Sequence, residues 1–208
     1  MISTIDEAIA FVHQSKIVTL TSVSGFPSLI SEIVGKPIRG SWWSHPQGNL
    51  IYMISEGLAD SLEILTVKLV YGKVSYVHKT LWTALYRVVT DIAWRNKRIA
   101  SLNSIEKRLL MEVEDREVVR INELITEWPS TSKAQKKEIT KARKQLESSL
   151  LVYSHQFHSE KGSHSTEIKL WENWVSEATK SSASKLSLNT AIDLLRKACN
   201  NEKLAIFK

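Results

Sequence analysis

The first half of the chain alternates helical and extended patterns of apolar residues. A capping box, Thr4-x-x-Glu7, stands before apolar residues spaced three and four apart, which predicts a helix beginning near residue 5. The patterns that follow predict an extended segment at 17–20, a short helix at 28–34, a helix or partial strand at 50–59, a hairpin at 64–70 and 73–78, and a helix at 81–98. The stretch 35–49, which holds Trp42-Trp43, is rich in glycine and proline and is expected to be a loop.

The second half carries clearer signals for the ends of its elements. Its predicted elements are a helix capped by Ser104, an extended segment at 118–121, a helix capped by Asn122, a turn at 129–131, a helix from the capping box Ser132-x-x-Gln135 to about residue 149, and strands at 150–157 and 166–171. Gly162 suits the left-handed position of a short loop between these strands. The Ser/Lys-rich stretch 176–185 is expected to be a mobile connection, and Ser187 is expected to cap a last helix.

This order of elements predicts the fold. Helix, strand, helix, turn, helix, strand, loop, strand is the order of a winged helix-turn-helix, and the first half has a similar order of three helices and a hairpin. We therefore expect a mainly α protein with small β-hairpins (an α+β fold) that contains a winged helix-turn-helix and a second winged-helix-like unit. The expected domains are an N-terminal unit at 1–100, the winged helix-turn-helix at 101–175, and a linker with a C-terminal helix at 176–208.

Composition narrows the class of protein. The chain has 208 residues, a formal net charge of +6 and 43% hydrophobic residues, so a folded core and an anionic partner are both compatible with it. Its single cysteine, Cys199, excludes an internal disulfide and a cysteine-based metal site. The N-terminus lacks the basic region of a signal peptide, and no apolar run is long enough for a transmembrane helix. We expect a cytoplasmic protein with no membrane partner.

The helix after Ser132 carries the strongest functional signal. With Ile139 set at 0°, Ala142, Leu146 and Leu150 fall in one apolar stripe at 100° per residue. By the same arithmetic Lys133, Lys144, Lys137 and Lys141 lie at about 120°, 140°, 160° and 200°, opposite the core. Such a helix anchors one face and presents cations to DNA phosphates with the other, although a solvated helix face has the same pattern.

We therefore expect this helix to contact double-stranded DNA, with the hairpin tip as a wing. The residues expected at the DNA are Ser132, Lys133, Gln135, Lys137, Lys141, Lys144, Lys161 and His164. Sequence specificity is not predicted, because only Gln135 and Gln145 are of a type that reads bases here. A protein-interaction module of the same fold is the main alternative.

Other chemistry finds less support. His155, His158 and His164 lie near the predicted wing, but the spacing brings at most two imidazoles to one face, which is too few for a closed zinc site. Trp42-Trp43 with His45 suits either packing or the stacking of a nucleobase. None of the common nucleophile, phosphate-loop, dinucleotide or zinc-protease motifs is present. We expect no metal, no cofactor and no catalytic residue, and an enzyme is the less favoured reading.

Several motifs together resemble the AlkZ-related winged-helix proteins of bacteria. They are Ser41-Trp42-Trp43-x-His45-Pro46, Lys68-Leu69-Val70-x-Gly72-Lys73-Val74, Lys144-x-Leu146-Glu147-x-x-Leu150-Leu151-Val152, His158-Ser159-Glu160-x-Gly162-x-His164 and Trp171-x-x-Trp174. The resemblance implies tandem winged-helix units and contact with DNA. The related family contains DNA glycosylases that unhook interstrand crosslinks through a Gln-x-Gln or Gln-x-Asp motif. No glutamine of this chain has such a partner, so a glycosylase-like enzyme with a non-standard site remains an alternative.

Overall fold

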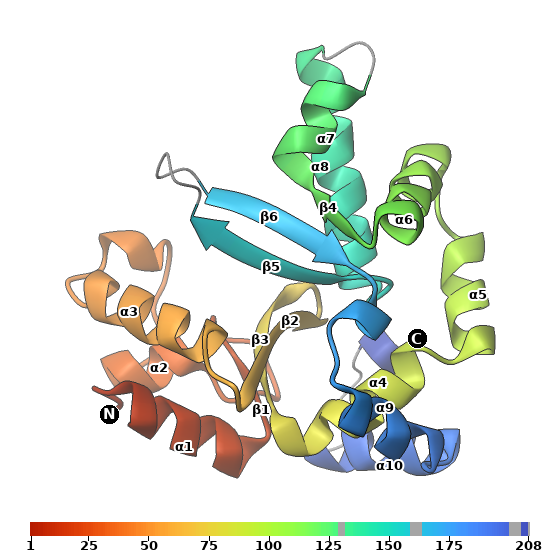
Figure 1. Cartoon of the computed structure of the whole chain (residues 1–208). Coiled ribbons are helices and arrows are strands. Elements are labelled where there is room, and N and C mark those ends of the chain that lie inside the picture. Colours follow the sequence, from red (N-terminus) through yellow and green to blue (C-terminus); the bar gives the residue numbers. More distant parts are fainter. Residues whose placement is uncertain (129–131, 159–163, 200–204, 208) are drawn as a thin grey trace. The chain divides into compact units, whose positions relative to one another are not determined.

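The computed structural model describes residues 1–128, 132–158, 164–199 and 205–207. The protein is mainly helical and has two small antiparallel sheets of three strands each (Figure 1). This confirms the predicted mixture of helices and small hairpins. The chain divides into two compact units, one of residues 1–85 with 186–208 and one of residues 86–185. The domain boundaries expected from the sequence, at 100/101 and 175/176, stay a prediction.

The first unit contains the N-terminal and C-terminal segments. Its elements are α1 (Ile5–Ser15), β1 (Ile17–Thr19), α2 (Leu29–Val34), the 3-10 turn η1 (Trp42–Ser44), α3 (Gly48–Ala59), β2 (Ile64–Val70), β3 (Lys73–His78), η2 (Lys79–Leu81), the first part of α4 (Trp82–Val89), α10 (Leu188–Ala198) and η4 (Ala205–Phe207). The capping box predicted at Thr4 and Glu7 is present and begins α1. Residues 48–59 are entirely helical, so the alternative of a partial strand there is wrong.

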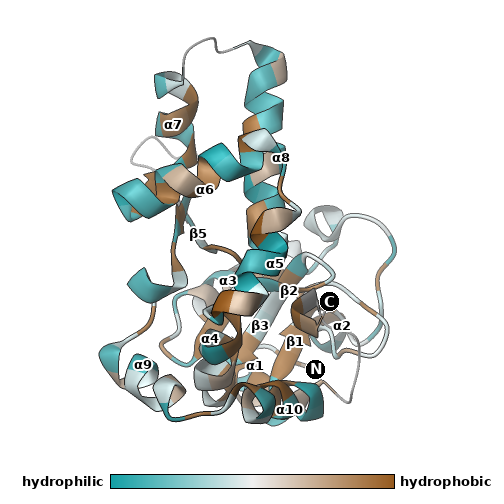
Figure 2. Cartoon of the chain, turned by 90° about the vertical axis from the view of Figure 1, so that its right-hand side faces the viewer, coloured by the Kyte–Doolittle hydropathy of each residue, from teal (hydrophilic) through white to brown (hydrophobic). Residues whose placement is uncertain are grey.

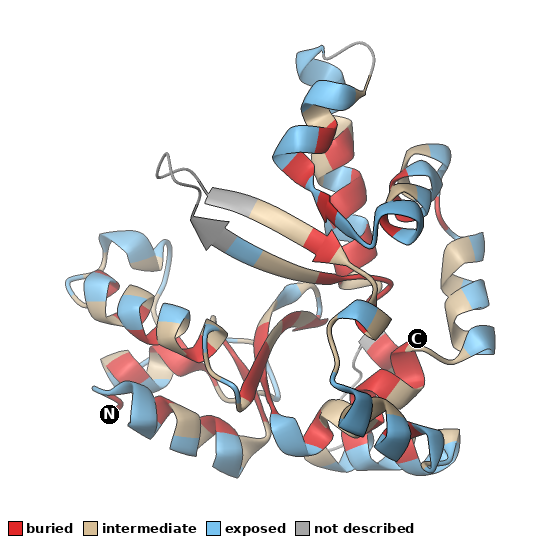
Figure 3. Cartoon of the chain, viewed as in Figure 1, coloured by how far each residue is buried: buried red, intermediate tan, exposed pale blue. Residues whose placement is uncertain are grey.

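The sheet of this unit has the strand order β1-β3-β2, with both pairs antiparallel. Val18 lies opposite Tyr76, and both are buried with the inner faces of α1, α2 and α3. Buried positions therefore follow one side of each of these three helices (Figure 3).

The second unit holds the remaining elements. These are the last residues of α4, α5 (Ile92–Ala100), α6 (Ser104–Arg116), β4 (Val118–Arg120), α7 (Ile121–Glu127), α8 (Lys133–Ser148), β5 (Tyr153–His158), β6 (His164–Lys169), η3 (Trp171–Asn173) and α9 (Glu177–Ser184). The strand order is β4-β6-β5, again antiparallel. Its core joins α6, α7 and α8 to the sheet through buried residues such as Leu109, Leu124, Leu146 and Ile168.

The two units repeat one topology. Each contains the order helix, short strand, helix, helix, strand, strand (α1–β3 and α6–β6), and in each the last of these strands lies between the other two. The first helix also ends in the same way in both, because Lys16 and Glu117 occupy almost the same unusual backbone conformation (φ 64°, ψ −41° and φ 63°, ψ −42°). No internal repeat is visible in the amino acids themselves, so the likeness lies in the backbone.

The structure corrects several predicted boundaries. The single helix expected at 81–98 is two helices, because Asp91 caps α5 by accepting a hydrogen bond from the Trp94 amide at 3.1 Å. Asn103, not Ser104, caps α6, and no side chain caps α7, which begins one residue before Asn122. The stretch 176–185, expected to be a connection without regular structure, forms α9.

The strands also differ from their predicted limits. The hairpin of the second unit spans residues 153–158 and 164–169, whereas strands were expected at 150–157 and 166–171. Leu150 has a left-handed φ of 57°, and Trp171 lies in η3, so the chain turns at both positions. Within the described ranges, no helix has the length and apolar character needed to cross a membrane.

Candidate nucleic-acid interface

Helix α8 is built as the sequence predicts. The Ser132 hydroxyl accepts from the Gln135 amide at 3.3 Å, and the Gln135 side-chain oxygen accepts from the Ser132 amide at 3.2 Å. This reciprocal cap satisfies two amides that a helix start otherwise leaves to water. The cap also engages the Gln135 oxygen, so contact between that oxygen and a base would require the cap to open.

The four lysines predicted to face away from the core are exposed. Ile139, Ala142 and Leu146 are buried, whereas Lys133, Lys137, Lys141 and Lys144 are all exposed. We call these four residues the lysine face. Among the described residues, only Lys141 of this face forms an ion pair, with Glu138 at 2.8 Å, and its side chain remains 72% exposed. The other three are available to bind anions.

One further cation belongs beside the lysine face. An ideal helix of 100° per residue would place Lys136 about 60° from Ile139, beside the core. Lys136 is nevertheless exposed, as are all residues from 132 to 137. No core covers the first turn of α8, where burial begins only at Ile139 (Figure 3). The hydrophilic colouring of this end of α8 in Figure 2 shows the same contrast with the apolar residues further along the helix. The absence of a large apolar residue between 132 and 138 is the sequence signal that identifies Lys136.

Arg143 does not belong to the exposed surface. An ideal helix would place Arg143 about 40° and Glu147 about 80° from Ile139, at the edge of the core. Both side chains are buried, with only 11% and 2% exposed, and they form an ion pair. Their spacing of four residues places them on neighbouring turns of one face. A buried charge of this kind is stable only when its partner is present.

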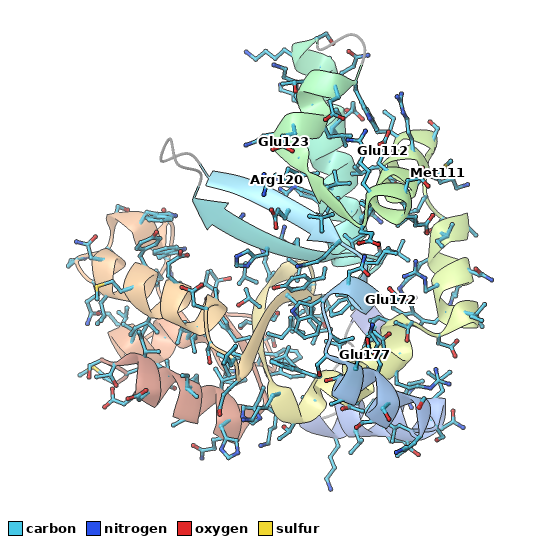
Figure 4. All side chains as sticks on the ribbon, viewed as in Figure 1. Met111, Glu112, Arg120, Glu123, Glu172 and Glu177 are labelled. Atoms are coloured by element: carbon cyan, nitrogen blue, oxygen red, sulfur yellow. The ribbon has the colours of Figure 1, made fainter. Side chains whose placement is uncertain are left out.

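Charges in the rest of the second unit are largely paired among themselves. Arg116 bridges Glu112 and Glu127, and Arg120 bridges Glu123 and Glu167 at 3.3 and 2.9 Å. Figure 4 shows Glu112 on α6, with Arg120 on β4 and Glu123 on α7. These arginines are engaged by carboxylates of α6, α7 and β6. The lysine face and Lys136 therefore form a group of exposed cations on one helix of the α6–α8 region.

The hairpin β5–β6 occupies the part of the chain in which a wing is expected. Its backbone register is described, but the side chains expected to contact DNA are not. His158 and His164 lie directly opposite each other in the backbone register, as the sequence predicts. Lys161 lies outside the described residues, and of His164 only the backbone is described. Their expected contacts with DNA stay predictions.

Aromatic residues close the base of this hairpin. Trp171 is fully buried and its indole N–H donates to the Leu150 carbonyl at 2.8 Å. Trp174 stacks on Tyr153 with ring centroids 5.1 Å apart. Trp171 is therefore a core residue and Trp174 covers it in part, and together they fix β5 relative to the end of α8.

A metal centre gains no support from the described side chains. Among them, no three histidine, cysteine, aspartate or glutamate side chains gather as ligands. Cys199 is buried in the first unit, and its thiol donates to the Arg196 carbonyl at 3.3 Å. The expectation that no cofactor is needed stays a prediction.

The fold and this surface define a class: this is a small, mainly helical protein of two similar units, one of which presents a cationic helix. A family model described as AlkZ related matches residues 2–204, and the chain belongs to this AlkZ-related family. The resemblance found in the residue motifs is thereby confirmed, and membership associates the chain with DNA repair. No curated protein and no solved structure matches the chain.

Proposed function

We propose that this protein is a non-catalytic DNA-binding protein, regulatory or associated with repair, built of two winged-helix units. In the second unit α7 and α8 act as the helix-turn-helix, and β5–β6 acts as the wing. The shared order of elements and the strand order β4-β6-β5 support this assignment. The family supports DNA as the partner.

The single observation that carries the proposal is the exposed lysine face on a helix anchored by its opposite side. Ile139, Ala142 and Leu146 hold α8 in the core, so the lysines are presented on a rigid support. Each phosphate that a lysine neutralises releases condensed counterions, which makes binding strong at low salt and independent of sequence. Ser132 and the first amides of α8 add hydrogen-bond donors at the positive end of the helix dipole.

The binding of a fluorescein-labelled duplex, followed by anisotropy at low salt, tests the proposal. The variant Lys137→Ala/Lys141→Ala/Lys144→Ala removes three cations of the lysine face, and we expect at least a tenfold loss of affinity from roughly three lost phosphate contacts. A matched control removes three exposed lysines elsewhere, Lys107→Ala/Lys185→Ala/Lys197→Ala, with the same change in net charge. Equal losses in the two variants would show a general charge effect and would contradict the assignment to α8.

Two alternatives have distinct outcomes in the same work. A glycosylase-like enzyme, for which family membership is the supporting observation, would generate alkali-labile abasic sites in an alkylated duplex. A protein-interaction module would bind no duplex, so the wild-type protein and the lysine-face variant would give the same anisotropy.

A further inference from the structure

A pair of tryptophans in the first unit forms a surface that the proposed function does not use. Trp42 packs against the core of this unit, and Trp43 stacks on Trp42 with ring centroids 4.1 Å apart and planes 22° from parallel. Trp43 nevertheless remains 63% exposed. We call Trp42 and Trp43 the aromatic step, because the half-buried ring of Trp42 supports the exposed ring of Trp43.

The backbone around the aromatic step is held in place. The His45 amide donates to the Trp42 carbonyl at 3.1 Å, and the Gly48 amide donates to the His45 carbonyl at 2.8 Å. A Cβ atom at Gly48 would lie 3.0 Å from the Trp43 carbonyl oxygen, so this close approach to the start of α3 favours glycine. The exposed ring is therefore a fixed feature of the surface, and its exposure does not result from a loose loop.

The charges in the chain segment that carries the aromatic step favour an anionic ligand. The sequence from residue 33 to 55 contains no carboxylate, and it includes Lys36 and Arg39, both exposed. A fully apolar partner surface would gain nothing from these cations. An exposed indole in a cationic segment without carboxylates suits the binding of unpaired nucleotides, because bases stack on aromatic rings and phosphates pair with cations.

We infer that the aromatic step binds an unpaired nucleobase of DNA, by stacking on the exposed part of the Trp43 ring, with Lys36 and Arg39 near the flanking phosphates. This inference rests on the proposed binding of DNA and adds a substrate class to it. Duplex with an unpaired or displaced base is preferred over fully paired duplex. The lysine face then supplies affinity for any duplex, and the aromatic step supplies the preference for the unpaired base.

The test compares two labelled duplexes of the same sequence, one fully paired and one with a single unpaired thymine. The full-length protein is expected to bind the second more tightly by about tenfold, the effect of one stacked base. Trp43→Ala removes this preference and leaves affinity for the paired duplex unchanged. Trp43→Phe retains a ring and keeps much of the preference, which separates stacking from damage to the fold. Met53→Ala is the matched control, because Met53 is equally exposed at 63% on α3 but carries no ring.

The outcomes separate this inference from the proposed function. If neither duplex binds, both fail. If the paired duplex binds through the lysine face but wild type shows no preference, or Trp43→Ala keeps the preference, only the aromatic step is refuted. An equal loss of preference in Met53→Ala would point to a general apolar surface, such as one for a protein partner, and would also overturn the inference.

Discussion

Helices α3 and α8 occupy the same place in the order that the two units share, but they expose different kinds of side chain. In α8 the exposed positions are largely lysines, whereas the fully exposed positions of α3 are Asn49, Met53 and Glu56. Both helices bury an apolar face against a three-stranded sheet with the same strand order. The buried residues of each helix therefore maintain the fold, while the exposed residues are free to determine what the unit binds.

The largest expected effect concerns the two glutamates that distinguish these helices. Glu147→Gln in α8 leaves Arg143 buried without its ionised partner and is expected to lower the free energy of unfolding by about 3–5 kcal/mol. Glu56→Gln on the exposed side of α3 is expected to change it by less than about 1 kcal/mol, because an interaction at the surface contributes little. Urea denaturation of both variants measures the contrast. The double variant Arg143→Met/Glu147→Leu should recover most of the lost stability, and failure to recover it would mean that the charge pair is not the cause.

A second prediction tests whether the buried faces are equivalent. Leu146 in α8 and Leu58 in α3 are both fully buried, so Leu→Ala at either position is expected to cost about 2–5 kcal/mol. Hydrogen exchange followed by mass spectrometry should show the loss of protection first in the unit that carries the substitution. If both variants lost protection first in the same unit, this would contradict the view that each helix supports its own core.

The buried tyrosine of the first sheet predicts an alkaline limit to stability. Burial raises the pKa of Tyr76 to about 12. Between pH 10 and 12 the unfolded chain releases this proton while the native chain retains it, so stability present below pH 10 falls as the pH rises through this window. The loss is about 2–3 kcal/mol from this residue. Tyr76→Phe should flatten the fall measured by denaturation at a series of pH values, whereas an unchanged slope would assign it to other groups.

The smallest expected effect tests the conformation that the two units share. Lys16 and Glu117 adopt a positive φ that glycine adopts readily and that strains residues with a Cβ. Lys16→Gly and Glu117→Gly should each raise the free energy of unfolding by about 0.5–1 kcal/mol. This value allows for the greater entropy that glycine gives the unfolded chain. Alanine at either position is the control and should give no gain. A gain in only one unit would show that the two helix ends are not equivalent.

Much of this architecture follows from local sequence signals. The capping boxes at Thr4 and Ser132 and the spacing of apolar residues place α1 and α8 correctly, because these features act within one or two turns. The break at Asp91 was also signalled by a good capping residue, but the continuous apolar face on either side concealed it. In α9 a low content of large apolar residues conceals a helix that begins with a Ser176 cap.

Long-range features could not be read in this way. The position of β6 between β4 and β5 depends on pairs such as Arg120 with Glu167, which are far apart in the sequence. Burial of Arg143 depends on what packs beside α8, and helical spacing alone does not contain that information. Among the candidate site residues, exposure of the lysines was predictable from the helix, whereas the exposure of Trp43 required the structure.

The salt dependence of duplex binding tests the central claim most directly. The slope of log affinity against log salt concentration should be about −3 or steeper for the wild-type protein, and it should flatten by roughly 2–3 in Lys137→Ala/Lys141→Ala/Lys144→Ala. The control Lys107→Ala/Lys185→Ala/Lys197→Ala should keep the wild-type slope. A wild-type protein that binds no duplex at low salt, or a lysine-face variant with an unchanged slope, would contradict the claim that α8 binds the DNA backbone.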